Sequence, residues 1–189
     1  MRGSFEPRDN PDIDSVWRWF EFQAALVREE HEHILRVLAP GSDIDVGTLR
    51  AYESQFIGLT EREIEQLFDD QRGHLELLTM FELLATTEAI LRIQFKARVA
   101  ERRKDGLSRR FRAAHKLNAG KIRLDKDILV ALRLREAGVA ARIIAAFSGT
   151  LRLRHWLAHG RHWHPKLGRG YTPGDVLGIA RELIDPIPA

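Results

Sequence analysis

The sequence predicts an all-α fold, an up-and-down bundle of helices that forms a single domain over residues 1–189. Apolar residues recur three and four positions apart along most of the chain, which is the spacing of helices with one buried face. No segment shows the alternation of apolar and polar residues that is typical of a strand. With 44% apolar and 30% charged residues, the composition is that of a globular protein with a real core.

Residues 1–11 are expected to be flexible, and the first helix follows them. Three residues offer caps for its start: Asp12, Asp14 and Ser15. Its apolar positions recur at helical spacing: Val16, Phe20, Leu26 or Val27, Ile34, Leu35 and Leu38. The segment PGSD at 40–43 ends it. Because Trp17 and Trp19 are two residues apart, they cannot share a helix face, so one is expected in the core and the other against a neighbouring helix or a partner.

A long helix is predicted next. Thr60 and Glu63 have the spacing of a capping box, and an apolar pattern of helical period extends from there to Val99. This pattern predicts one very long central helix, or two helices joined near Gly73. It fades at the segment RRKDG, where Gly106 is expected to be the C-cap.

Shorter helices are predicted after this point. Ser108 is expected to cap a helix that ends at residue 117, and Asp125 begins another. Gly138 interrupts that helix, and the apolar period then continues to Trp156, which we expect in the core.

The last helix is predicted from residue 173 to about 184. Thr172 has the character of an N-cap, Pro173 suits the first helical position and Asp175 suits the third. The segment DPIPA ends the helix.

Several classes of protein do not fit the composition. The chain has no cysteine, which excludes disulfides, thiolate metal sites and a cysteine nucleophile. No apolar run approaches the length that a membrane span needs, and the N-terminal region lacks the apolar core of a secretory signal. We therefore expect a cytoplasmic protein without a membrane partner.

Charge is distributed very unevenly along the chain. Residues 1–91 hold 8 basic and 19 acidic residues, a net charge of −11, whereas residues 92–135 hold 15 and 4, a net charge of +11. A block this basic indicates a polyanionic partner. Packing of the acidic half against the basic half, or two solvated helix faces, would account for the same pattern.

The stretch LRLRHWLAHGRHWHP at 151–165 carries most of the functional information, with four histidines and three arginines. His155 and His159 share a helix face and have a spacing that can bind zinc. However, Trp156 stands where the Glu of an H-E-x-x-H site would be, and arginines would place positive charge beside the ion. We predict no metal and no other cofactor. A basic helix end with no further role is a second interpretation.

Acid–base chemistry on RNA is a third interpretation of this stretch. RNA is cleaved without a metal when the neighbouring 2′-hydroxyl attacks the phosphorus. That reaction needs a group that exchanges a proton near neutral pH, which histidine supplies. It also needs a cation with several donors to hold the phosphate, which arginine supplies.

The segment from Arg154 to His159, Arg-His-Trp-Leu-Ala-His, resembles the Arg-x4-to-6-His motif of HEPN (higher eukaryotes and prokaryotes nucleotide-binding) domains. The layout is similar as well, because the motif comes late in an all-α chain, after a long helix and before one more. The resemblance covers residues from about 60 to 185. The family often has a polar residue, commonly Asn, after the arginine, and here that residue is His155.

This resemblance implies a bundle of HEPN type, usually a homodimer in which two copies of the motif meet. Many members are metal-independent endoribonucleases of toxin–antitoxin, phage-defence or RNA-processing systems, and others bind nucleotides or partners without catalysis. By position, Arg154 would bind the scissile phosphate, His159 would be the general acid/base and His155 would assist. Glu88, in the apolar and small segment LLATTEAILRI, is the candidate for acidic support, or else a partly exposed helix residue.

The basic block supplies a candidate surface for RNA, since its cations come on consecutive helical turns with few aromatic residues between them. Such a surface contacts phosphates and reads little sequence. Its centre, with one cation from the motif region, is Arg102, Arg103, Lys104, Arg109, Arg110, Arg112 and Arg161.

Three functions follow from the sequence. The first is a homodimeric endoribonuclease, possible partners being RNA and an antitoxin or regulatory protein. The second is a non-catalytic HEPN-like module that binds RNA, a nucleotide or a protein. The third is a helical protein whose uneven charge mediates assembly.

Overall fold

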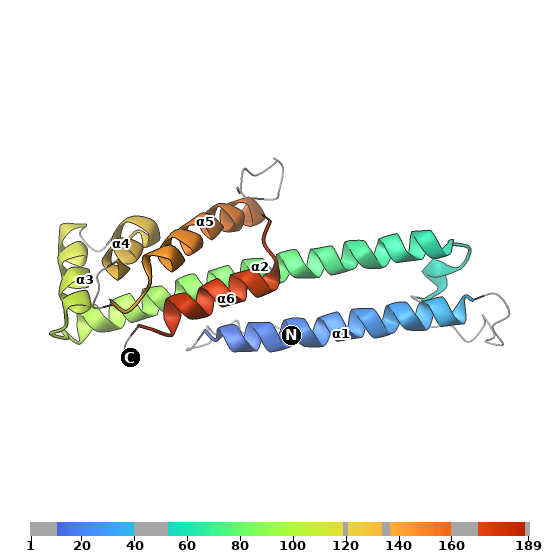
Figure 1. The fold of residues 1–189 in the computed structure, drawn as a ribbon, viewed down its shortest axis with the longest axis horizontal. Coiled ribbons are helices and arrows are strands. Elements are labelled where there is room, and N and C mark those ends of the chain that lie inside the picture. The colour runs from blue at the N-terminus through green and yellow to red at the C-terminus, as the bar shows by residue number, and fades with distance from the viewer. Residues whose placement is uncertain (1–10, 40–52, 119–120, 134–136, 160–169, 188–189) are drawn as a thin grey trace, which may run out of the picture. The chain divides into compact units, whose positions relative to one another are not determined.

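A computed structural model describes residues 11–39, 53–118, 121–133, 137–159 and 170–187 (Figure 1). Every regular element in these ranges is helical, which confirms the all-α prediction. The chain divides into two compact units, one formed by Arg18–Leu78 and the other by Met1–Trp17 together with Thr79–Ala189. No helix in the described ranges combines the length and the apolar character that are needed to cross a membrane.

The unit Arg18–Leu78 is built from two antiparallel helices. It contains most of α1 (Ile13–Val37), the 3₁₀ turn η2 (Glu53–Phe56) and the first half of α2 (Glu61–Ala100). Its buried core lies near the connection between the helices and consists of Ile34, Phe56, Ile64 and Phe68. The ring of Phe68 stacks on Phe56 with centroids 5.6 Å apart, and on His31 with centroids 4.5 Å apart.

The start of α1 belongs to the other unit, and Asp12, one of the three candidate caps, makes the capping contacts. The Asp12 carboxylate accepts a hydrogen bond from the Asp14 amide at 2.9 Å and from the Ser15 hydroxyl at 2.6 Å. Asp14 in turn pairs with Arg181, whose Nη2 lies 2.6 Å from Oδ1. These contacts order the first turn of α1 and join it to the last helix of the same unit.

Helix α2 begins with the predicted capping box. The Thr60 amide and hydroxyl donate to the Glu63 carboxylate at 2.8 and 2.7 Å, and the Glu63 amide donates to the Thr60 hydroxyl at 3.3 Å. The two hydrogen bonds from Thr60 hold the pKa of Glu63 below its ordinary value. The helix then continues without a break through Gly73 for 40 residues.

The corner between α2 and α3 (Gly106–Leu117) differs from the prediction. Gly106 is the first residue of α3 and not a C-cap of α2, and Ser108 lies inside α3 and is not its N-cap. The cap is Asp105, whose carboxylate accepts from the Ser108 amide at 2.8 Å and the Ser108 hydroxyl at 2.6 Å. As the N-cap, Asp105 accepts from the amide of the third helical residue, Ser108, whereas a capping Ser108 would accept from an amide two or three residues further along the chain.

Four further helical segments complete the described part of this unit. One π-helical turn, η3 (Leu124–Ile128), continues into α4 (Leu129–Leu132), and α5 (Ala141–Ala158) follows. Before α5, Gly138 has a φ of +73°, and a Cβ there would lie 3.2 Å from the Pro186 carbonyl oxygen, so glycine suits both the backbone and the space. The last helix, α6 (Pro173–Ile184), begins with the predicted N-cap Thr172, and Asp175 completes a capping box with it.

The helices of this unit enclose one set of apolar side chains. Helix α5 packs on α4 and α6, and α3 packs on η3 and α4. On α2, the ring of Phe95 meets Phe111 of α3 with centroids 4.9 Å apart. Buried aliphatic residues such as Leu91, Ile144 and Leu183 complete the core. The arrangement sets the inner face of α5 beside α2, and this brings the motif region near Glu88.

Candidate functional site

Arg154 of the motif lies on α5 and pairs with Glu88 of α2. The Arg154 Nη2 is 3.0 Å from the Glu88 Oε2, and the exposed fractions of the two side chains are 37% and 15%. The Arg154 Nε is buried and has no hydrogen-bond partner among the described residues. The structure therefore brings together two residues that the sequence proposed for one site, 66 positions apart.

Glu88 lies between two arginines. Its Oε1 accepts from the Nε and the Nη2 of Arg92, both at 2.8 Å. The Arg92 Nη1 donates to the Ile122 carbonyl oxygen at 3.2 Å. Arg92 is thus held at both ends, and it fixes the carboxylate that holds Arg154. One carboxylate shared by two guanidinium groups leaves a positive charge, so the cluster favours an anion.

The two motif histidines also meet. The rings of His155 and His159 have centroids 4.2 Å apart and are tilted by 54°. Both side chains are exposed. His159 is the C-cap of α5, and its amide donates to the His155 carbonyl oxygen at 3.1 Å.

The geometry separates the site into two adjoining parts. Five residues along a helix correspond to a rotation of about 140°, so Arg154 and His159 point to different sides of α5. Arg154 faces α2 and Glu88, whereas the two histidines are exposed at the helix end. Trp156, which we expected in the core, is only half-buried.

The predicted RNA surface falls partly on described residues. Arg102, Lys104, Arg109 and Arg110 are exposed. Arg103 and Arg112 make contacts within the fold: the Arg103 Nε lies 2.5 Å from the Glu101 Oε2, and the Arg112 Nη1 donates to the Arg103 carbonyl oxygen at 2.6 Å.

Arg161, the seventh cation proposed for RNA binding, lies outside the described residues, and so do the other two histidines of the stretch at 151–165.

Arg98, one of the cations of the basic block, is almost fully buried, with 2% of its side chain exposed. Its Nη1 lies 3.2 Å from both the Asp105 Oδ1 and the Ser108 Oγ. Burial raises the pKa of Asp105, but the hydrogen bonds from Ser108 and the charge of Arg98 outweigh it and lower the pKa below its ordinary value. Arg98 therefore stabilises the α2–α3 corner, and its charge is compensated within the fold.

Sequence reasoning also missed the part that Arg92 plays beside Glu88. The signal was present, because a glutamate followed four residues later by an arginine is a favourable pair on a helix surface. The pair of Glu88 and Arg92 becomes part of the candidate site only because Arg154 of α5 also contacts Glu88. No local sequence pattern predicts that contact.

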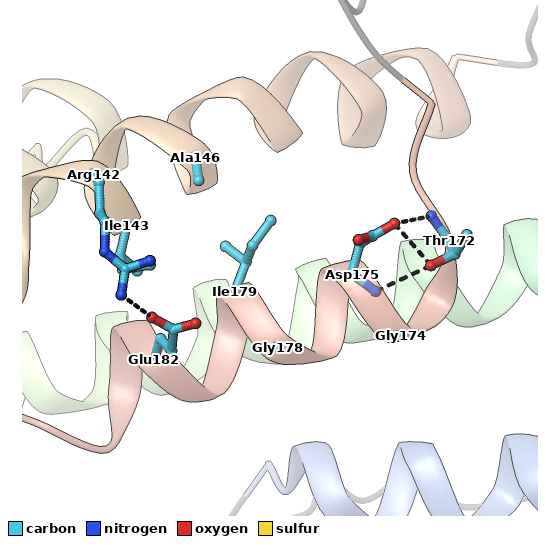
Figure 2. Close-up of a pocket in the computed structure, with 9 residues that line it drawn as sticks. All are labelled: Arg142, Ile143, Ala146, Thr172, Gly174, Asp175, Gly178, Ile179 and Glu182. Atoms are coloured by element: carbon cyan, nitrogen blue, oxygen red, sulfur yellow. Dashed lines mark hydrogen bonds and ion pairs between the residues drawn. The ribbon is translucent and has the colours of Figure 1, made fainter.

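A groove of about 550 Å³ lies between α5 and α6 (Figure 2). At one end Arg142 pairs with Glu182 at 2.9 Å, and at the other the Asp175 carboxylate accepts from the Thr172 amide and hydroxyl at 2.9 and 2.8 Å. Glycine and apolar side chains line the remainder: Ile143, Ala146, Gly174, Gly178 and Ile179. The polar side chains of the groove therefore form an ion pair and a helix cap. None of the site residues that were predicted from the sequence lines the groove.

Among the described residues, no group of three or more His, Asp and Glu side chains is arranged to hold a metal ion. Comparison with known proteins adds no relative: no family model matches the chain, no curated protein matches it and no solved structure matches it. The resemblance to HEPN domains therefore stays a prediction, which rests on the motif from Arg154 to His159 and on its helical setting.

Proposed function

We propose that this chain is a metal-independent endoribonuclease with a bundle of HEPN type, in which α2 is the long central helix. The observation that carries the proposal is that the guanidinium group of Arg154 is only partly satisfied by hydrogen bonds. Glu88 holds one of its nitrogens, while its Nε is buried without an acceptor in the described part of the chain. An unsatisfied buried donor costs about 1–3 kcal/mol, and a shift of the part-exposed side chain toward a bound phosphate would give this nitrogen an acceptor.

In the proposed reaction, the 2′-hydroxyl of a ribose attacks the adjacent phosphorus and forms a new P–O bond. The bond from phosphorus to the 5′-oxygen of the next nucleotide breaks. His159 accepts the hydroxyl proton, and His155 beside it donates the proton that the leaving 5′-oxygen takes up. Arg154 holds the phosphate and its developing charge. The products are a 2′,3′-cyclic phosphate and a 5′-hydroxyl end.

A homodimer fits this chemistry. Because Arg154 and His159 point to different sides of α5, a phosphate held by one arginine would reach the histidine pair of a second copy, or its own pair through the length of the arginine side chain. We propose that two copies meet at the motif. The exposed cations Arg102, Lys104, Arg109 and Arg110 would add phosphate contacts, with little reading of sequence.

The test is cleavage of a single-stranded RNA in EDTA by the purified protein. We expect a 2′,3′-cyclic phosphate end, and activity reduced about a hundredfold or more in His159→Ala. His115→Ala is the matched control, because His115 is also exposed on a helix of this unit but lies outside the motif. Equal cleavage by wild type and His159→Ala would exclude the proposed acid–base role.

The ion pair between Arg154 and Glu88 supports a second candidate function, a non-catalytic HEPN-like module. The carboxylate neutralises part of the charge that would stabilise a transition state, and the pair would suit steady binding of RNA or a nucleotide. This candidate predicts RNA binding that weakens steeply with salt and yields no product. For either function we propose a cytoplasmic role in a toxin–antitoxin or phage-defence system, with an antitoxin or regulatory protein as a further partner.

A further inference from the structure

Large apolar side chains are exposed on the unit Arg18–Leu78. Trp19, Phe22 and Leu26 of α1 have exposed fractions of 41%, 60% and 44%, and Leu78 of α2 has 48%. Single exposed apolar residues are common on protein surfaces, but a contiguous group of them indicates an interaction site. We call these four residues the apolar face.

Helix geometry places the apolar face on one side of the unit. Trp19, Phe22 and Leu26 fall within an arc of about 60°, turned about 90° from the core residue Ile34. The two helices are antiparallel (Figure 1). Their register is set by the His31 ring stacked on Phe68 and by the Arg72 Nη1, which lies 3.5 Å from the His31 Nδ1. In this register Phe22 is level with Leu78, and the helical wheel of α2 places Leu78 on the same side as the α1 residues.

The same stretch of the unit has no buried side chain of its own. In α1, none of the residues 18–33 is buried, and in α2 none of the residues 69–78 is buried. The buried core of this unit lies near the other end, around Ile34 and Phe68. Two helices can bury only the strip of side chains along which they meet. At this end of the unit, Trp19, Phe22, Leu26 and Leu78 lie outside that strip and are exposed to water.

Charge indicates the kind of partner. The described residues of this unit include eleven acidic and five basic side chains, a net charge of −6. Helical wheels of α1 and α2 place three acidic residues and one basic residue on the side of the apolar face: Glu29, Glu30 and Asp70, and Arg18. An apolar strip beside carboxylates is complementary to an amphipathic helix that carries basic residues beside its apolar stripe.

We propose that the apolar face of the unit Arg18–Leu78 binds a basic amphipathic helix of a partner protein. A second copy of this chain is a poorer occupant, because two such faces would bring an excess of carboxylates together. The same charge opposes RNA and an anionic lipid surface. This site belongs to a different unit of the chain from the motif, and the proposal does not depend on the proposed nuclease function.

The experiment measures binding of a fluorescent 18-residue Leu/Lys peptide to the full-length protein by anisotropy. The peptide has leucines at helical spacing on one face and lysines elsewhere, and a control peptide has glutamate in place of lysine. The test variant is Phe22→Ser/Leu26→Ser, whose fold is checked by circular dichroism. Leu117→Ser is the matched control, since Leu117 is also exposed but lies in the other unit.

We expect the basic peptide to bind, the acidic peptide not to bind, and the double variant to weaken binding about tenfold or more. Glu29→Gln/Glu30→Gln is expected to weaken binding and to reduce its salt dependence. The proposal is overturned if the basic peptide does not bind, if both peptides bind equally, or if the double variant binds as well as Leu117→Ser.

Sedimentation equilibrium tests the competing occupant. We expect the oligomeric state to be the same in wild type and Phe22→Ser/Leu26→Ser. Dissociation of a wild-type dimer by this double substitution would show that the face joins two copies, and the proposal would then be wrong.

Discussion

Replacing Glu88 by glutamine is expected to loosen the centre of the candidate site. The carboxylate accepts from Arg154 at 3.0 Å and from two nitrogens of Arg92, both at 2.8 Å. Glutamine has a single acceptor oxygen, and its amide group would face a guanidinium that has only donors. At least one arginine must therefore lose its partner.

The size of this effect follows from burial and charge. A hydrogen bond to a charged group contributes about 1.5–3 kcal/mol when it is shielded from water. Glu88 is 15% exposed, but the side chains of Arg92 and Arg154 are 41% and 37% exposed, so water compensates for part of the loss. We expect Glu88→Gln to lower the free energy of unfolding by about 1–2 kcal/mol, and the melting temperature by about 2–8 °C.

Thermal unfolding followed by circular dichroism measures this change. Glu82→Gln is the matched control, because Glu82 is an exposed glutamate on the same helix, and its replacement is expected to shift stability by less than about 0.5 kcal/mol. Hydrogen exchange of the Arg154 Nε–H, which is buried in the wild type, is expected to become faster in Glu88→Gln. Identical melting temperatures and exchange rates in wild type and Glu88→Gln would refute the anchoring role of Glu88.

Two further predictions concern the α2–α3 corner. Arg98→Ala removes a buried cation from Asp105 and Ser108 and is expected to lower the free energy of unfolding by about 2–4 kcal/mol in urea titrations, whereas Lys96→Ala, on an exposed position of the same helix, changes it little. If both variants unfold at the same urea concentration, Arg98 is not a structural anchor. The pKa of Asp105 is lower in the folded chain than its unfolded value near 3.8, so its charge stabilises the fold above that pH, and the contribution is lost as the pH falls through the lower folded pKa. Melting temperatures measured between pH 7 and pH 2 should therefore show a gap between wild type and Asp105→Asn that closes below about pH 4, and a gap of constant size would contradict the assignment.

Local signals explain which helix boundaries could be predicted. The capping box at Thr60 and the N-cap at Thr172 were predicted correctly, because a capping side chain and its backbone partners lie within four residues of each other. At the α2–α3 corner, both Asp105 and Ser108 are residue types that cap helices; the prediction of Ser108 as the cap was wrong, and Asp105 is the cap. Asp105 also pairs with Arg98 of the preceding helix, a contact that no local pattern predicts.

The candidate site shows the same division between local and tertiary information. The sequence proposed Arg154 and His159 from a six-residue motif, and Glu88 from its position in an apolar and small segment. It left open whether Glu88 was exposed, since exposure depends on α5, which follows dozens of residues later. Arg92 was overlooked for this reason, and Trp156 was expected in the core although the end of α5 leaves it half-buried.

By itself, the sequence determined the helical class, most of the helix boundaries and the charge of each half of the chain, because periodicity, caps and composition act over a few residues. Only the tertiary structure decided which charged groups meet. It joined Arg154, Glu88 and Arg92, buried Arg98 and left Trp19, Phe22, Leu26 and Leu78 in water. Electrostatic and apolar contacts depend on distance in space, and only the packed chain sets those distances.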